Sequence, residues 1–153
     1  MAITEARNIT IEATPGEIMD VLIDLESLPD WSSAHQEVEV LERDDQGRPR
    51  KSRQVVKIVG VSDDQVLDYT VHDDGVSWTL VSSKQQRAQR GRYTLTAHGD
   101  STDVHFELTV DLVVPLPGFL VKRGAKGLMK TATDGLRKQV LKVKKGGNQT
   151  PSS

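Results

Sequence analysis

The chain has 153 residues, of which 36% are hydrophobic and 27% are charged, a length and composition typical of one globular domain. It contains no cysteine, which excludes disulfides, thiolate nucleophiles and cysteine-ligated zinc. No apolar run approaches the roughly 18 residues of a membrane span, and the N-terminus lacks the pattern of a signal peptide. We therefore expect a cytoplasmic protein.

The net charge of −2 conceals an uneven distribution of charge along the chain. Residues 1–47 hold twelve acidic and two basic side chains, whereas residues 117–153 hold nine basic side chains and one acidic side chain. Such a split marks either a charged partner, such as an anionic membrane, or a helix that solvates its outer face with lysine. We favour the second explanation.

The first 31 residues predict a strand followed by two short helices. Apolar and polar residues alternate over residues 8–13, as in a half-buried strand. Thr14 then precedes a proline, and Glu17 follows three residues after Thr14, which is the pattern of a capping box at a helix start. Apolar residues recur at helical spacing over residues 18–25, and residues 27–31 form a second short helix or a turn that ends in Trp31.

Residues 36–115 predict six further strands with one apolar face each. Turn signals separate them at residues 44–47, 60–64, 73–75 and 98–100. Three aspartate pairs, Asp44–Asp45, Asp63–Asp64 and Asp73–Asp74, fall in these turns, and we assign them to turn chemistry. The basic run Lys84–Arg92 is expected to be a solvated strand edge.

The C-terminal part predicts one long helix over about residues 119–145 and a disordered tail over residues 146–153. An apolar stripe at spacings of three and four residues runs along this helix: Val121, Ala125, Leu128, Ala132, Leu136, Val140 and Val143. No second helix of that length is present to cover the stripe, so it must pack on the apolar face of the sheet. Residues 1–145 thus predict a single α+β domain, a curved antiparallel sheet of about seven strands around a long C-terminal helix.

This order of elements resembles the START-like superfamily, whose helix-grip fold is found in enzymes, carriers and receptors. The resemblance rests on the cap at Thr14–Glu17, the helix at residues 18–22, and the linker at residues 24–31 with its proline and tryptophan. It covers residues 9 to about 145 and is greatest for the bacterial branch of polyketide cyclase/dehydrase and lipid-transport proteins. The resemblance implies an internal cavity for an apolar ligand.

Catalytic groups are scarce, and we assign no catalytic residue, metal site or cofactor. No pair of the four histidines has the spacing of a metal site. His35, near the expected opening of the cavity, is the best candidate for an acid or base, although an exposed loop histidine is the simpler interpretation.

Strand parity and the helical stripe together predict which side chains line the cavity. A few polar tips among aliphatic and aromatic groups would suit an apolar ligand with a few polar groups. The predicted ligand-binding residues are Trp31, Gln54, Val56, Ile58, Tyr69, Trp78, Tyr93, Phe106, Leu108, Val110, Leu128, Ala132 and Leu136.

Three functions remain open at this point. The leading hypothesis is a monomeric or weakly dimeric carrier of a lipid, polyketide or similar molecule, with peripheral contact to an anionic membrane through the basic C-terminal helix. The second is a cyclase or aromatase in which Tyr69, Tyr93 or His35 transfers protons. The third is a ribosome- or RNA-associated regulator that binds through Lys84, Arg87, Arg90 and Arg92. Nucleic acid is not the expected partner, because aromatic side chains are nearly absent from this run.

Overall fold

The computed structural model describes residues 2–58 and 60–149. Seven antiparallel strands form one sheet in the order β1-β7-β6-β5-β4-β3-β2. All neighbours except β1 and β7 are consecutive in the chain, so the sheet is a meander with β1 added at one edge. The strands are β1 (Ala2–Ile11), β2 (His35–Arg43), β3 (Pro49–Ile58), β4 (Val61–His72), β5 (Gly75–Ser82), β6 (Gln86–His98) and β7 (Ser101–Leu112).

Short helices connect β1 to β2, as the sequence predicts. They are α1 (Pro15–Leu22), the 3-10 turn η1 (Leu25–Ser27) and α2 (Leu28–Trp31). The capping box at the start of α1 is confirmed: the Glu17 N–H donates to Thr14 Oγ1 at 3.2 Å, and the Thr14 N–H donates to Glu17 Oε1 at 2.9 Å. Helix α1 buries Ile18, Val21 and Leu22.

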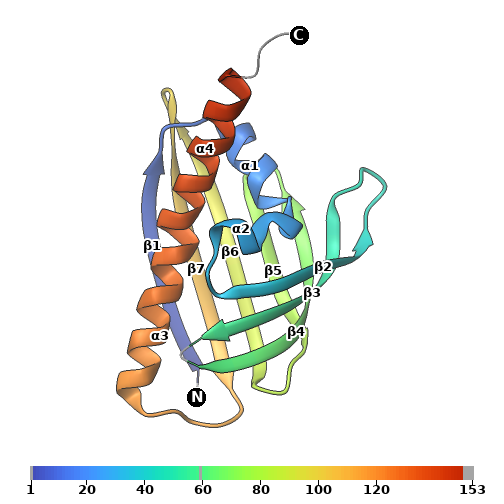
Figure 1. Cartoon of the computed structure of the whole chain (residues 1–153), viewed down its shortest axis with the longest axis vertical. Coiled ribbons are helices and arrows are strands. Elements are labelled where there is room, and N and C mark those ends of the chain that lie inside the picture. The colour runs from blue at the N-terminus through green and yellow to red at the C-terminus, as the bar shows by residue number, and fades with distance from the viewer. Residues whose placement is uncertain (1, 59, 150–153) are drawn as a thin grey trace.

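The long C-terminal helix lies across the concave face of the sheet, which curves around it (Figure 1). It consists of α3 (Gly118–Lys130), a π-helical segment η2 (Thr131–Gly135) and α4 (Leu136–Gln149). The sequence predicts the helix but not the π segment. Helix α4 continues four residues beyond the expected end at residue 145, because helix ends are poorly marked by sequence; the rest of the expected tail lies outside the described residues.

The main hydrophobic core lies between α1, the C-terminal helix and strands β5 to β7. Its fully buried side chains include Ile11, Ile18, Val104, Leu136 and Val140. A smaller cluster of Leu25, Leu67 and Tyr69 lies against β2 and β5. Trp78 packs against both clusters, and members of both clusters line the pocket described below.

Two predictions about the outer face fail in part. The basic run is not a sheet edge at Arg90–Arg92, which pair with both β5 and β7, whereas residues 86–89 pair with β7 and have no partners on β5. Val143 is 50% exposed although it belongs to the predicted apolar stripe. Leu136 and Val140, which precede Val143 on the same stripe of α4, are fully buried, so the stripe is uncovered at its C-terminal end.

Candidate functional site

A pocket of about 230 Å³ lies between the concave face of the sheet and the helices. Ligand pockets in proteins commonly measure about 300–1,000 Å³, so this one suits a small molecule or one end of a longer molecule. Its walls come from α2, strands β1 and β3 to β7, the β7–α3 connection and the C-terminal helix, with His35 at the start of β2.

The structure places most of the predicted residues around this pocket. Twelve of the thirteen residues predicted from the sequence border the pocket: Trp31, Gln54, Val56, Ile58, Tyr69, Trp78, Tyr93, Phe106, Leu108, Val110, Leu128 and Ala132. Leu136 does not border it. It is the first residue of α4, directly after the π segment, and it has no exposed surface and packs in the main core.

Four aromatic rings form one wall of the pocket. The Trp78 ring centre lies 5.5 Å from that of Tyr69, 5.9 Å from that of Tyr93 and 6.0 Å from that of Phe106. The indole of Trp78 lies directly on the backbone of Gly91, where an added Cβ would stand 2.2 Å from two ring carbons. The absence of a side chain at Gly91 is what permits this position.

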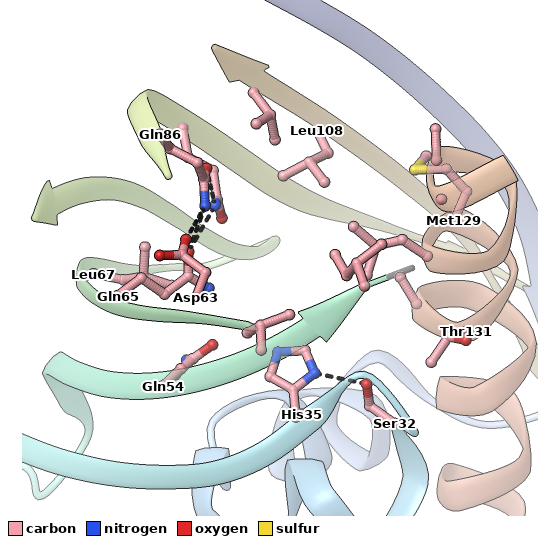
Figure 2. A pocket seen from close by; sticks show the side chains of 18 of the residues that line it. Ser32, His35, Gln54, Asp63, Gln65, Leu67, Gln86, Leu108, Met129 and Thr131 are labelled. Atoms are coloured by element: carbon pink, nitrogen blue, oxygen red, sulfur yellow. Dashed lines mark hydrogen bonds between the residues drawn. The ribbon is translucent and has the colours of Figure 1, made fainter. Parts of the chain in front are cut away.

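His35 borders the pocket and makes a short hydrogen bond with Ser32, which is buried. The His35 Nδ1 and Ser32 Oγ atoms are 2.6 Å apart, as the dashed line in Figure 2 marks. Burial lowers the pKa of the His35 imidazole from 6.5 to about 4, and an interaction with Gln54 opposes this effect only in part. His35 is therefore neutral at pH 7. The sequence placed His35 near the pocket but gave no reason to pair it with Ser32.

The two tyrosine hydroxyls of the wall are held by hydrogen bonds. Gln54, which is 1% exposed, donates from Nε2 to Tyr69 Oη at 2.9 Å and to Ser52 Oγ at 3.0 Å. The Tyr93 hydroxyl donates to the Ala132 carbonyl in the π segment at 2.8 Å. Burial raises the pKa of both tyrosines, so each hydroxyl keeps its proton at neutral pH.

A second polar group of side chains, which sequence reasoning missed, borders the pocket at Asp63, Gln65, Gln86 and Gln89. We call it the Asp63 cluster and include Ser83, which bonds to it. The assignment of Asp63 to a turn is wrong: β4 begins at Val61, and Asp63 is an inward-facing strand residue that is only 8% exposed. Asp63 and Gln65 share the parity of Leu67 and Tyr69, which is the signal that could have identified them.

The basic side chains of β6 lie on the opposite, outer face of the sheet. Arg87 and Arg90 are exposed, and Arg92 forms an ion pair with Asp74 at 3.2 Å. These arginines do not border the pocket. Within the described residues there is no group of three or more His, Cys, Asp or Glu side chains that could hold a metal ion, and no helix has the length and apolar character required to span a membrane.

Solved structures with this fold cover nearly the whole chain. A START superfamily protein from Mycobacterium smegmatis is 23% identical, with a TM-score of 0.82, over 92% of this chain and 98% of its own. A protein from Thermus thermophilus is 21% identical, with a TM-score of 0.77, over 92% and 99%. The ZhuI aromatase/cyclase from a Streptomyces species is 9% identical, with a TM-score of 0.79, over 100% and 99%. At these identities the likeness shows the fold.

Sequence comparison identifies the family. No curated protein sequence matches the chain. The family described as polyketide cyclase/dehydrase and lipid transport matches residues 11–137, which is most of the chain and leaves out nearly all of β1 and most of α4. The chain therefore belongs to the polyketide cyclase/dehydrase and lipid-transport family, which has the START-like fold.

Proposed function

We propose that the chain is a cytoplasmic carrier that binds an apolar small molecule in the pocket and does not transform it. The observation that supports this most directly is the lining itself. Aliphatic and aromatic side chains dominate it, and most of its polar groups gather on the His35–Gln54 side and in the Asp63 cluster, with Glu5 of β1 and Thr131 of the C-terminal helix apart from both. Such a surface favours an apolar body by burial and leaves few groups to orient it.

The experiment is native mass spectrometry on gently purified protein, followed by identification of any bound molecule. The two tryptophans, Trp31 and Trp78, both border the pocket, so their fluorescence offers a second readout with added lipids and polyketides. We expect a stoichiometric apolar adduct and a change in fluorescence. An apo mass together with unchanged fluorescence across the panel would refute the carrier function.

A matched pair of variants tests whether the pocket is the binding site. Ala125 is half-buried in α3 and borders the pocket, whereas Ala88 is exposed on β6. Ala125→Phe should fill the pocket and abolish the adduct, while Ala88→Phe should retain it. Loss of the adduct from both variants, or from neither, would place the ligand elsewhere.

We also propose that the end of the molecule near the start of α3 contacts an anionic membrane. Phe119 and Val114 are 72% and 61% exposed, and the exposed Lys122 and Arg123 follow on the same helix. Their neighbours Leu116 and Leu120 border the pocket, so a ligand could pass from the membrane at this end. Insertion of an aromatic ring beside basic side chains is a common mode of peripheral binding.

Sedimentation with vesicles tests this contact. Binding to vesicles that contain phosphatidylserine should weaken with added salt and with Phe119→Ser, while Val143→Ser, at an exposed position on α4, should leave it unchanged. Equal binding by both variants would remove the membrane from the proposal.

A cyclase-type enzyme is the second candidate, and the Ser32–His35 pair is the observation that favours it. A neutral imidazole in an apolar pocket can accept a proton from an acidic carbon between two carbonyl groups. Turnover of a poly-carbonyl thioester that disappears in His35→Gln, with binding retained, would establish this activity. Absence of turnover in the unaltered protein would eliminate it.

A further inference from the structure

The Asp63 cluster provides a buried charged group in a mostly apolar pocket, whose other carboxylate, Glu5, is exposed. Asp63 lies on β4 and is 8% exposed, and Gln65, two residues on, is 4% exposed. Figure 2 shows both side chains beside Gln86 of β6, on the side of the pocket away from Met129 of α3. A buried carboxylate is costly unless a partner compensates for its lost hydration, so the partners of Asp63 decide what it can do.

The hydrogen bonds around Ser83 make the Asp63 carboxyl group an acceptor. Ser83 Oγ accepts the backbone N–H groups of Gln85 at 3.0 Å and Gln86 at 3.1 Å. Its own proton is therefore directed to the Asp63 carboxyl oxygens, which are 2.7 and 2.8 Å away. Gln86 Nε2 also donates to Asp63 Oδ2 at 2.7 Å. Asp63 acts as an acceptor in each of these bonds.

The rest of the cluster provides amide dipoles and no cation. Gln65 Oε1 accepts from Gln86 Nε2 at 2.9 Å and from Gln89 Nε2 at 3.0 Å. Gln89 Oε1 in turn accepts from Trp78 Nε1 at 2.8 Å, which ties the cluster to the aromatic wall. No ion pair among residues 2–58 and 60–149 includes Asp63. The carboxylate is hydrogen-bonded but not neutralised.

A ligand that brings a hydrogen-bond donor to this point would compensate for the buried charge. A protonated amine supplies both donors and a positive charge, a hydroxyl supplies a donor alone, and a carboxylate adds a second negative charge. Hydrogen bonds that involve a charged group are about twice as strong as neutral ones, and like charges in a poorly hydrated site repel. The pocket should therefore rank these three head groups in that order.

We propose that Asp63 is the head-group site of the pocket, where it binds a protonated amine or, less tightly, a hydroxyl of an otherwise apolar ligand. The aromatic wall of Tyr69, Trp78, Tyr93 and Phe106 holds the apolar body. This inference rests on the proposed carrier function and assigns that carrier a class of ligand: amphiphiles with a donor head, and not fatty acids.

The test compares three probes with the same chain, namely octylamine, octanol and octanoate, by tryptophan fluorescence and calorimetry. Asp63→Asn is compared with Asp64→Asn. Both variants remove one negative charge, but Asp64 is on the outer face, where its side chain is 57% exposed and pairs with Arg53. A general effect of net charge on amine binding would be the same in both.

We expect the unaltered protein to bind octylamine most tightly and octanoate least. Asp63→Asn should weaken octylamine binding about 10- to 100-fold, the range expected for loss of a charge-assisted hydrogen bond, and Asp64→Asn should change it less than about twofold. The ranking in the unaltered protein tests the inference even if Asp63→Asn does not fold.

Equal binding of the three probes, tighter binding of octanoate, or equal effects of the two variants would overturn the head-group site while leaving the carrier function intact. Failure of every probe to bind the unaltered protein would overturn both.

Discussion

Gly91 is the position at which the aromatic wall is most easily disturbed. Replacement of Gly91 by alanine would place a Cβ 2.2 Å from atoms Cε2 and Cζ2 of Trp78 and 2.7 Å from Nε1. Carbon atoms in contact are separated by about 3.5–4.0 Å, so the indole must move by more than about 1 Å. The backbone of β6 cannot move away instead, because it is bonded to β5 and β7 on its two sides.

The energetic cost follows from what the indole now contacts. It packs against three rings, and its Nε1 donates to Gln89 Oε1 at 2.8 Å. Overpacking of a core costs about 1–3 kcal/mol, and the lost hydrogen bond about 0.5–1.5 kcal/mol. Alanine offsets about 0.5–1 kcal/mol of this cost, because the unfolded chain with alanine at this position loses less backbone entropy on folding than the chain with glycine. The net loss is about 0.5–4 kcal/mol in the free energy of unfolding, or about 2–4 °C in Tm for each kcal/mol.

Urea denaturation followed by circular dichroism measures this loss, and two further proteins control for it. Gly127→Ala makes the same substitution on the exposed face of α3, where nothing lies within 4 Å of an added Cβ, and should stabilise the protein by about 0.5–1 kcal/mol. In a Trp78→Leu background, the cost of Gly91→Ala should fall below about 0.5 kcal/mol. The same cost in both backgrounds would show that the indole is not the source of the strain.

Three other perturbations follow from the described contacts. Thr14→Ala removes the side-chain half of the capping box and should cost about 0.5–2 kcal/mol in urea denaturation; a smaller loss would show that α1 is held by packing alone. Leu136→Ala should cost about 2–5 kcal/mol because Leu136 is fully buried, yet the folded variant should bind apolar probes with unchanged affinity, since this residue does not border the pocket. The pKa of His35 is lowered to about 4 in the folded state, so the unfolded chain binds the proton first as pH falls. The contribution of His35 to the free energy of unfolding is complete above pH 6.5 and declines toward pH 4 by at most about 1.4 kcal/mol per pH unit. His35→Asn should remove this part of the pH dependence of stability. Identical stability–pH profiles for the variant and the unaltered protein would contradict the lowered pKa.

The fold could be predicted from sequence because its local signals agree with one another. The capping box, the alternation in six strands and the stripe on the long helix each require the same arrangement. The alternation in the strands also indicates much of the pocket lining, since every second side chain of a strand points to the inner face of the sheet and must face either the core or the pocket. The parity of Gln54, Tyr69 and Phe106 was sufficient to place them.

The misplaced residues mark the limits of local patterns. Leu136 lies on the predicted helical stripe, but a π segment that no local pattern indicates comes directly before it. The last residue of that segment, Gly135, packs against the Trp31 carbonyl. A Cβ at Gly135 would be only 2.8 Å from that oxygen. The pairing of His35 with Ser32 likewise depends on the turn after α2, for which the spacing of the two residues gives no signal.

Asp63 shows how a polar residue in a strand is misread, and the error itself bears on function. Two adjacent aspartates after a glycine are typical of a turn, and this turn signal conflicts with the strand parity that Asp63 shares with Leu67. A chain selected only for stability would place an apolar side chain there, because a buried carboxylate without a cation opposes folding. Departures from local rules that persist in a folded protein concentrate at functional sites. The glutamines and the serine around Asp63 reduce its cost without cancelling its charge, and a donor head group on the ligand is the partner that would.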